Sequence, residues 1–205
     1  MSYNVYMNFI DQSVLNFFEN TRVEWLSFVI LVITYCGSYI VVSGLTFLSA
    51  ISFYIHKHTA RILPLLAAVG GSAATTFILK NIFFRARPLG ALYLETGSSF
   101  PSGHATAAIA LYGFLLYTIW SHSTLPSHEA SDGHSKASWD KDWLHKILAV
   151  FLSVLIILVG ISRLYLGVHY LSDILVGYAI GLIWLLLSIK LHKYILRFFG
   201  RLGSY

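Results

Sequence analysis

The chain has 205 residues, of which 57% are hydrophobic and only 11% are charged, and its formal net charge is +5. So few charges cannot coat a soluble globule of this size, which excludes an ordinary soluble protein and indicates a single membrane domain over residues 1–205. The positive charge does not indicate nucleic-acid binding, because the cations lie at the ends of apolar segments and not in a stripe among exposed aromatic residues. A membrane lipid headgroup is the anionic partner that this distribution favours.

Residues 1–22 are predicted to form an amphipathic helix that lies along the membrane interface. Apolar residues recur there at helical spacing beside polar residues such as Asp11, Asn16 and Glu19. A tail that only looks amphipathic fits the same pattern and stays an alternative. The segment lacks the basic start of a cleavable secretory signal, so we expect no such signal.

Five further segments are each long and apolar enough to cross a hydrocarbon core as a helix, which takes about 20 residues. In chain order they cover residues 25–54, 60–84, 103–120, 144–162 and 171–189. The predicted fold is therefore an all-α integral membrane bundle of about five transmembrane helices, with a tilt or an interfacial extension of the long first helix. Residues 121–143 are polar and are predicted to form a cytoplasmic loop. The histidines in and beside that loop lack the compact spacing of metal ligands, so no metal site is expected.

Basic residues beside membrane spans stay preferentially in the cytoplasm, and this preference orients the predicted bundle. Those on one side, nine of the fourteen in the chain, are Lys57, Arg61, Lys136, Lys141, Lys146, Lys190, Lys193, Arg197 and Arg201. Four of the other five lie in three polar motifs at the opposite side. We therefore expect an extracytoplasmic N-terminus and motif face, and a cytoplasmic C-terminus, in a plasma membrane of the bacterial type.

The first motif contains Lys80 near the end of the second span and Arg87 seven residues later, followed by the helix-ending Pro88. A guanidinium group binds phosphate oxygens in bidentate fashion, whereas a lysine acts as a compact positive charge. Simple extension of these side chains toward the interface is the alternative. For Arg85, we predict only that extension.

The second motif is Pro101-Ser102-Gly103-His104, immediately before the third span. Backbone N–H groups in the first turn of a helix have no partner within the helix, so they can bind an anion. Gly103 permits close approach, the Ser102 hydroxyl adds a donor, and His104 can give a proton to a leaving group. A plain serine–glycine helix cap is an equally good explanation of these four residues.

The third motif is Ser162-Arg163, at the end of the fourth span, followed by His169 and Asp173. His169 and Asp173 are four residues apart at a helix start, so their side chains share one face. A carboxylate that holds one ring nitrogen leaves the other nitrogen aimed as a nucleophile. Taken alone, a histidine at the interface beside a helix-capping aspartate explains this pair better. The joint occurrence of three motifs on one predicted face favours a phosphate site.

The three motifs together resemble those of the type 2 phosphatidic acid phosphatase superfamily. That pattern is a lysine, six residues and Arg-Pro; then Pro-Ser-Gly-His; then Ser-Arg, five residues, a histidine, three residues and an aspartate, all intact here over a core of about residues 60–191. The resemblance implies that His169 attacks phosphorus to form a phosphohistidine, that Asp173 orients it, and that His104 protonates the leaving group. The residues that it implies for phosphate binding are Lys80, Arg87, Ser102, Gly103, Arg163 and Ser162.

The resemblance implies a lipid phosphatase that needs no metal or other cofactor. Undecaprenyl diphosphate, phosphatidylglycerophosphate and phosphatidic acid are the candidate substrates, and the compact outer loops favour a prenyl diphosphate. Two other classes stay open: a vanadate-dependent haloperoxidase, whose known members are soluble, and a non-catalytic lipid carrier. Membrane members of the superfamily usually have six spans, so the N-terminal amphipathic helix is expected to replace one of them.

Overall fold

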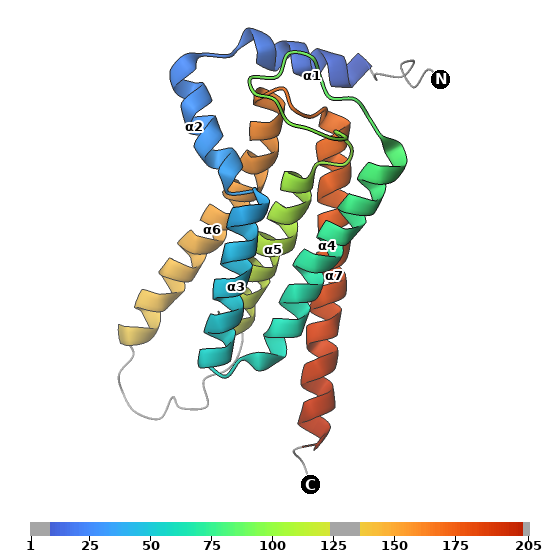
Figure 1. Cartoon of the computed structure of the whole chain (residues 1–205). Helices are drawn as coiled ribbons and strands as arrows, with labels where there is room; N and C mark the ends of the chain where they lie inside the picture. Colours follow the sequence, from blue (N-terminus) through green and yellow to red (C-terminus); the bar gives the residue numbers. More distant parts are fainter. Residues whose placement is uncertain (1–8, 124–135, 203–205) are drawn as a thin grey trace.

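The computed structural model of the chain describes residues 9–123 and 136–202, and these residues form helices and connecting loops without a strand. The elements are α1 (Phe9–Asn20), α2 (Glu24–Tyr35), α3 (Tyr39–Ile55), the short 3-10 helix η1 (Thr59–Arg61), α4 (Ile62–Phe83), α5 (Gly103–Ser123), α6 (Lys136–Tyr165) and α7 (Leu171–Leu202). Helices α3 to α7 form an elongated bundle, and α1 lies across one end of it (Figure 1). The prediction of an all-α architecture is confirmed.

Helix α5 lies in the middle of the bundle, where it contacts α4, α6 and α7. Its Ala108, Leu111 and Phe114 side chains have no exposed surface. Small residues let the neighbouring backbones approach, since an added Cβ at Gly181 of α7 would lie 2.6 Å from the carbonyl oxygen of Thr106. This packing holds the start of α5 firmly against α7.

The outer faces of the bundle are apolar. Large exposed residues on these faces include Phe77, Ile78, Phe151, Ile157, Leu182 and Ile183. The segments Thr59–Phe83, Trp143–Tyr165 and Leu171–Phe199 are long and apolar enough to cross a membrane. An apolar surface of this extent is stable in a bilayer and prone to association in water. These three segments therefore correspond to three of the five predicted spans.

The first predicted span, residues 25–54, is not one continuous helix. It consists of α2 and α3, which are bent by 44° at the break between them and count as one candidate span only when taken together. The backbone at Gly37 packs so closely that an added Cβ would lie 2.5 Å from Val159 Cγ1 and 3.1 Å from His104 Cβ. Ser38 then caps α3, because its Oγ accepts a hydrogen bond from the Val41 N–H. Hydropathy does not indicate this break, because the residues on both sides of it are mostly apolar.

Two further segments differ in part from expectation. Helix α5 extends to Ser123 and α6 begins at Lys136, so both ends of the predicted loop 121–143 are helical, while residues 124–135 lie outside the described residues. Within residues 1–22, residues 1–8 are also outside them, and α1 is a helix of 12 residues. Helix α1 is too short to span a bilayer, and its location at the membrane interface stays a prediction.

Candidate active site

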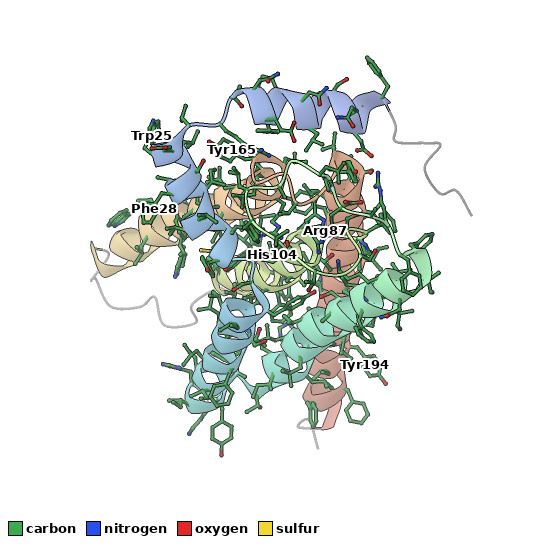
Figure 2. All side chains as sticks on the ribbon, turned by 45° about the horizontal axis from the view of Figure 1, so that its top comes forward. Trp25, Phe28, Arg87, His104, Tyr165 and Tyr194 are labelled. Carbon is green, nitrogen blue, oxygen red and sulfur yellow. The ribbon has the colours of Figure 1, made fainter. Side chains whose placement is uncertain are left out.

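The three polar motifs meet at the end of the bundle that α1 crosses. Figure 2 looks onto this end, with Arg87 and His104 near the middle of the bundle, while Trp25 and Phe28 of α2 point outward. The motif residues come from the end of α4, the loop 84–102, the start of α5, the end of α6, the segment 166–170 and the start of α7. The structure thus brings together segments that are up to 93 residues apart in the chain, the separation of Lys80 and Asp173, which interact electrostatically.

His169 and Asp173 face each other in a buried pair. His169 Nδ1 lies 3.4 Å from Asp173 Oδ2, and the two side chains are 1% and 0% exposed. Asp173 Oδ2 also accepts a hydrogen bond of 2.9 Å from the Tyr170 N–H, which fixes the carboxylate at the start of α7. Burial lowers the pKa of His169 to about 4, although contact with Asp173 opposes that shift. The imidazole is therefore neutral near pH 7, as a nucleophile must be.

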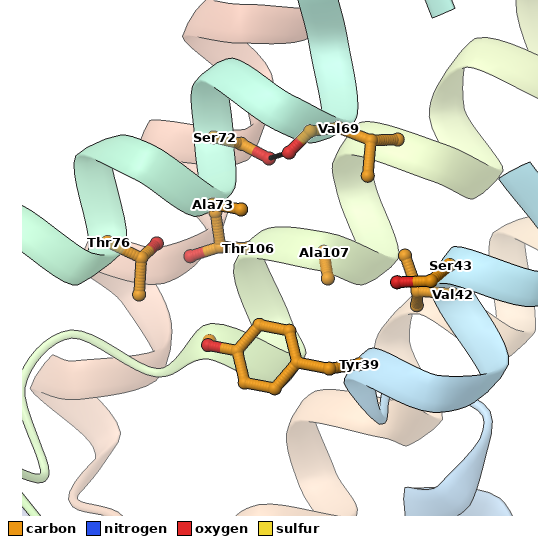
Figure 3. Close-up of a pocket in the computed structure, with 10 residues that line it drawn as sticks. Tyr39, Val42, Ser43, Val69, Ser72, Ala73, Thr76, Thr106 and Ala107 are labelled. Atoms are coloured by element: carbon orange, nitrogen blue, oxygen red, sulfur yellow. Dashed lines mark hydrogen bonds between the residues drawn. The ribbon is translucent and has the colours of Figure 1, made fainter. Parts of the chain in front are cut away.

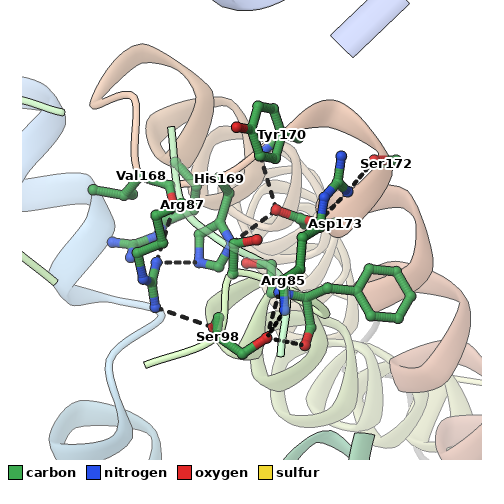
Figure 4. A network of polar contacts seen from close by, with 12 residues as sticks. Arg85, Arg87, Ser98, Val168, His169, Tyr170, Ser172 and Asp173 are labelled. Carbon is green, nitrogen blue, oxygen red and sulfur yellow. Dashed lines mark hydrogen bonds and ion pairs between the residues drawn. The ribbon is translucent and has the colours of Figure 1, made fainter. Parts of the chain in front are cut away.

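Arg87 lies directly beside the other nitrogen of His169. Its Nη1 is 3.3 Å from His169 Nε2 and donates to the Val168 carbonyl oxygen at 2.9 Å (Figure 4). Its Nε donates to the Gly97 carbonyl oxygen at 3.1 Å. The guanidinium group is thus held from both sides next to the nitrogen that would attack phosphorus.

Arg163 and Lys80 supply further positive charge. Arg163 has no exposed surface, and its Nη1 donates to Thr34 Oγ1 at 2.8 Å and to the Tyr93 hydroxyl. Lys80 Nζ donates to the Ser98 carbonyl oxygen in the loop 84–102. A buried guanidinium group without an anion is costly, and in this structure the Glu95 carboxylate pairs with Arg163.

The Pro-Ser-Gly-His motif lies against the start of α7. The Ser102 N–H donates to the Asp173 carbonyl oxygen at 3.0 Å, so this backbone group is already used. The Ser102 hydroxyl is buried and has no partner among the described residues, as expected of a group that binds a ligand. A Cβ at Gly103 would lie 2.3 Å from the Tyr39 hydroxyl, so a side chain there would displace Tyr39. His104 interacts electrostatically with His169, Arg87 and Arg163.

Ser162 is arranged differently from the other predicted phosphate ligands. It is fully buried, and its Oγ donates to the Val159 carbonyl oxygen of the same helix at 2.6 Å. In this arrangement its hydroxyl proton is not available to a phosphate oxygen.

The prediction that Arg85 only extends toward the interface is wrong. Arg85 Nη1 lies 2.6 Å from Asp173 Oδ1 and 2.7 Å from Ser172 Oγ, and its Nη2 lies 2.8 Å from Asp11 Oδ2. Its guanidinium carbon also lies 4.3 Å from the centre of the Tyr170 ring. Arg85 therefore binds the carboxylate that faces His169 (Figure 4).

Asp11 was also missed, and it ties α1 to this network. Its carboxylate accepts hydrogen bonds from the Ser172 N–H at 2.9 Å and from Ser172 Oγ at 2.6 Å, and it is 3% exposed. Burial opposes ionisation of Asp11, but hydrogen bonds from Ser172 and Arg85 hold its pKa below the ordinary value. An acidic residue on the apolar side of the amphipathic helix was the one signal of this contact in the sequence.

The fold and the site together define a helical membrane protein with a buried histidine among cationic side chains. The chain belongs to the PAP2 superfamily, whose family model matches residues 61–197. It is similar to phosphatidylglycerophosphatase B of Bacillus subtilis (strain 168), with 29% identity over 163 residues that cover 79% of this chain and 73% of that protein.

Two crystal structures share the fold. A transmembrane PAP2-type phosphatidylglycerolphosphate phosphatase from Bacillus subtilis matches with a TM-score of 0.76 and 28% identity, over 90% of this chain and 85% of that one. Aquifex aeolicus LpxE matches with a TM-score of 0.63 and 24% identity, over 93% of this chain and 99% of that one. The predicted superfamily and the integral membrane location are confirmed. These relatives support a membrane lipid phosphatase over a haloperoxidase or a carrier.

Proposed function

We propose that the chain removes the terminal phosphate of phosphatidylglycerophosphate through a phosphohistidine on His169. One observation carries the proposal: a buried, neutral His169 has Asp173 on one ring nitrogen and Arg87 at 3.3 Å from the other. This arrangement suits attack on a phosphorus atom whose oxygens bind Arg87. The names of the two Bacillus subtilis relatives support the choice of substrate.

The reaction has two steps. His169 Nε2 attacks phosphorus, the bond from phosphorus to the lipid oxygen breaks, and His104 gives its proton to that oxygen. Water then attacks the phosphohistidine, His104 takes a proton from it, and inorganic phosphate leaves with His169 restored. Lys80, Arg87 and Arg163 neutralise the charge that spreads over the phosphoryl oxygens, with the Ser102 hydroxyl as a further donor.

The structure has a small cavity beside the second motif. It lies between α3, α4 and α5, beside Gly103 (Figure 3). Its hydroxyl-bearing lining residues are Tyr39, Ser43, Ser72, Thr76 and Thr106. The Thr76 hydroxyl is buried and has no partner among the described residues. The other lining residues include Val42, Val69, Ala73 and Ala107, which are apolar, and the Ser72 and Thr106 hydroxyls already donate to the Val69 and Ser102 carbonyl oxygens. The lining is therefore mixed, and the choice of phosphatidylglycerophosphate rests on the names of the relatives.

The proposed topology keeps five spans in a single domain. Helix α5 is less apolar than the three segments above, because it contains His104 and several small and hydroxyl residues, yet it has 21 residues and packs in the middle of the bundle. Helices α2 and α3, taken together as one broken span, supply the fifth. The connection between α3 and α4 and the C-terminal end of α7 lie at the end opposite the site (Figure 1). That connection contains Lys57 and Arg61, which supports an extracytoplasmic site and a cytoplasmic C-terminus.

The test is phosphate release by the purified chain in detergent micelles with EDTA present. The substrates are phosphatidylglycerophosphate, undecaprenyl diphosphate and phosphatidic acid at equal mole fractions. We expect release to be fastest from phosphatidylglycerophosphate and absent in His169→Ala. Turnover retained in a folded His169→Ala would overturn the mechanism. Bromide oxidation by the vanadate-loaded chain without phosphatase activity would overturn the reaction class.

A further inference from the structure

Glu95 places a carboxylate among the groups that the proposed function assigns to phosphate. Its Oε2 lies 3.3 Å from Arg87 Nη1 and forms an ion pair with Arg163 Nη2. The same Arg87 nitrogen lies 3.3 Å from His169 Nε2. One guanidinium nitrogen thus contacts both the proposed nucleophile and this carboxylate.

The environment of Glu95 suits an anion that another anion can replace. Its side chain is 26% exposed, whereas that of Arg163 is fully buried. A carboxylate and a phosphoryl group both accept paired hydrogen bonds from guanidinium groups. Asp11 and Asp173, by contrast, are buried and bound by Arg85 and by backbone N–H groups.

The backbone around Glu95 is held in place while its side chain extends toward the arginines. On one side, the Leu92 N–H donates to the Leu166 carbonyl oxygen at 2.9 Å. On the other, the Gly97 carbonyl oxygen accepts from Arg87 at 3.1 Å. Rotation about the side-chain bonds of Glu95 is therefore enough to vacate the position, without movement of the loop 84–102.

We propose that Glu95 is an internal competitor for phosphate, which sets the affinity of the site for phosphoryl groups and speeds the release of inorganic phosphate. This inference rests on the proposed function. A phosphoryl group that binds Arg87 and Arg163 displaces the Glu95 carboxylate, because two anions so close repel each other. After hydrolysis the carboxylate returns to the two arginines, and the phosphate dianion leaves.

The direction in which one substitution changes the affinity for phosphate separates this role from a structural one. Glu95→Gln keeps the size and the acceptor oxygen but removes the negative charge, so a competitor role predicts tighter binding of phosphate and of orthovanadate. If Glu95 instead only holds Arg163 in position, the substitution loosens that side chain and weakens the binding of both anions.

The experiment measures orthovanadate binding by isothermal titration calorimetry and inhibition of turnover by inorganic phosphate, with the full chain in detergent micelles. We expect Glu95→Gln to tighten both by roughly fivefold, the size of one partly exposed ion pair. Glu24→Gln is the control, because Glu24 is exposed at the start of α2 and the charge change is the same. Glu95→Asp, whose shorter side chain reaches the arginines less well, should tighten both to a smaller extent.

Unchanged or weaker vanadate binding in Glu95→Gln, in a sample that melts like the parent protein, would overturn the inference. If Glu95→Gln does not fold, the same two measurements on Glu95→Asp show whether the affinity for these anions rises or falls. If the parent protein hydrolyses lipid phosphate but the Glu95 variants do not bind vanadate more tightly, the competitor role is refuted and the proposed function stands. Tighter vanadate binding in a chain that hydrolyses none of the lipids refutes the proposed function alone.

Discussion

Arg85 donates to Asp173 Oδ1 at 2.6 Å, and it thereby holds the carboxylate whose other oxygen faces His169. The same guanidinium group is bound by Asp11 of α1, 74 residues earlier in the chain. The acidic residue of the His169–Asp173 pair is therefore positioned, through Arg85, by a residue that lies outside the three sequence motifs.

Asp11→Asn should lower kcat by roughly fivefold and leave KM nearly unchanged. The substitution removes one of the two carboxylates that share Arg85, so Arg85 and Asp173 are held less firmly, at a cost of about 1 kcal/mol in the transition state. Steady-state kinetics on phosphatidylglycerophosphate measures the split between kcat and KM. Asn16→Ala on the exposed face of α1 is the control. A rise in KM at constant kcat would contradict a positioning role.

His104→Ala should lose phosphate release from lipid substrates but keep much of the first step with an aryl phosphate. A phenolate with a low pKa leaves without a proton, so that substrate bypasses the proposed acid. Burst kinetics with p-nitrophenyl phosphate should show release of p-nitrophenol followed by slow turnover. Equal loss of the burst and of lipid hydrolysis, in a folded variant, would remove His104 from the role of proton donor.

Arg163→Lys should lower kcat/KM by about 10- to 100-fold, because lysine keeps the charge but loses the planar fork. The guanidinium group donates to Thr34 and Tyr93 through one nitrogen and pairs with Glu95 through another, and an ammonium group cannot match this arrangement. Activity and circular-dichroism melting are measured on the same sample. Full activity in Arg163→Lys would show that charge alone is sufficient.

His169 should make the stability of the protein depend on pH between about 6.5 and 4. Burial lowers its pKa from the ordinary value of 6.5 to about 4, so the unfolded chain takes up this proton at a higher pH than the folded protein does. The stabilisation is therefore complete above pH 6.5 and is lost as the pH falls toward 4. Melting temperatures at pH 7 and 5 should differ less in His169→Ala than in the parent protein. An equal difference would contradict a neutral, buried imidazole.

Gly37→Ala should impair both stability and activity, whereas Gly44→Ala should not. A Cβ at Gly37 would lie 2.5 Å from Val159 Cγ1 and 3.1 Å from His104 Cβ, whereas a Cβ at Gly44 meets nothing within 4 Å. The overpacking at Gly37 should cost about 1–3 kcal/mol and displace His104. Thermal melting and phosphate release measure both effects. Similar behaviour of the two variants would show that the break after α2 tolerates a side chain.

The sequence predicted the main helices, because long apolar segments are a local signal. Closely spaced polar residues likewise marked the three motifs, which the structure brings to one end of the bundle. The break at Gly37 and Ser38 was missed because it depends on the approach of α5 and α6, which hydropathy does not record. Arg85 was assigned only to the interface, since its partner Asp11 lies in a different predicted element. Glu95 was missed because it stands outside all three motifs and becomes notable only when Arg87 and Arg163 are seen on either side of it.

Helix α1 lies across the site end of the bundle, and its Asp11 reaches Arg85 and Ser172. If α1 lies along the membrane interface, as predicted, its attachment to the lipid surface and the orientation of Asp173 depend on the same helix. A bilayer that moves α1 away from the bundle would break the contacts of Asp11 with Arg85 and Ser172 and leave Asp173 less firmly held beside His169. The composition of the surrounding lipid would then affect the rate of turnover as well as the supply of substrate.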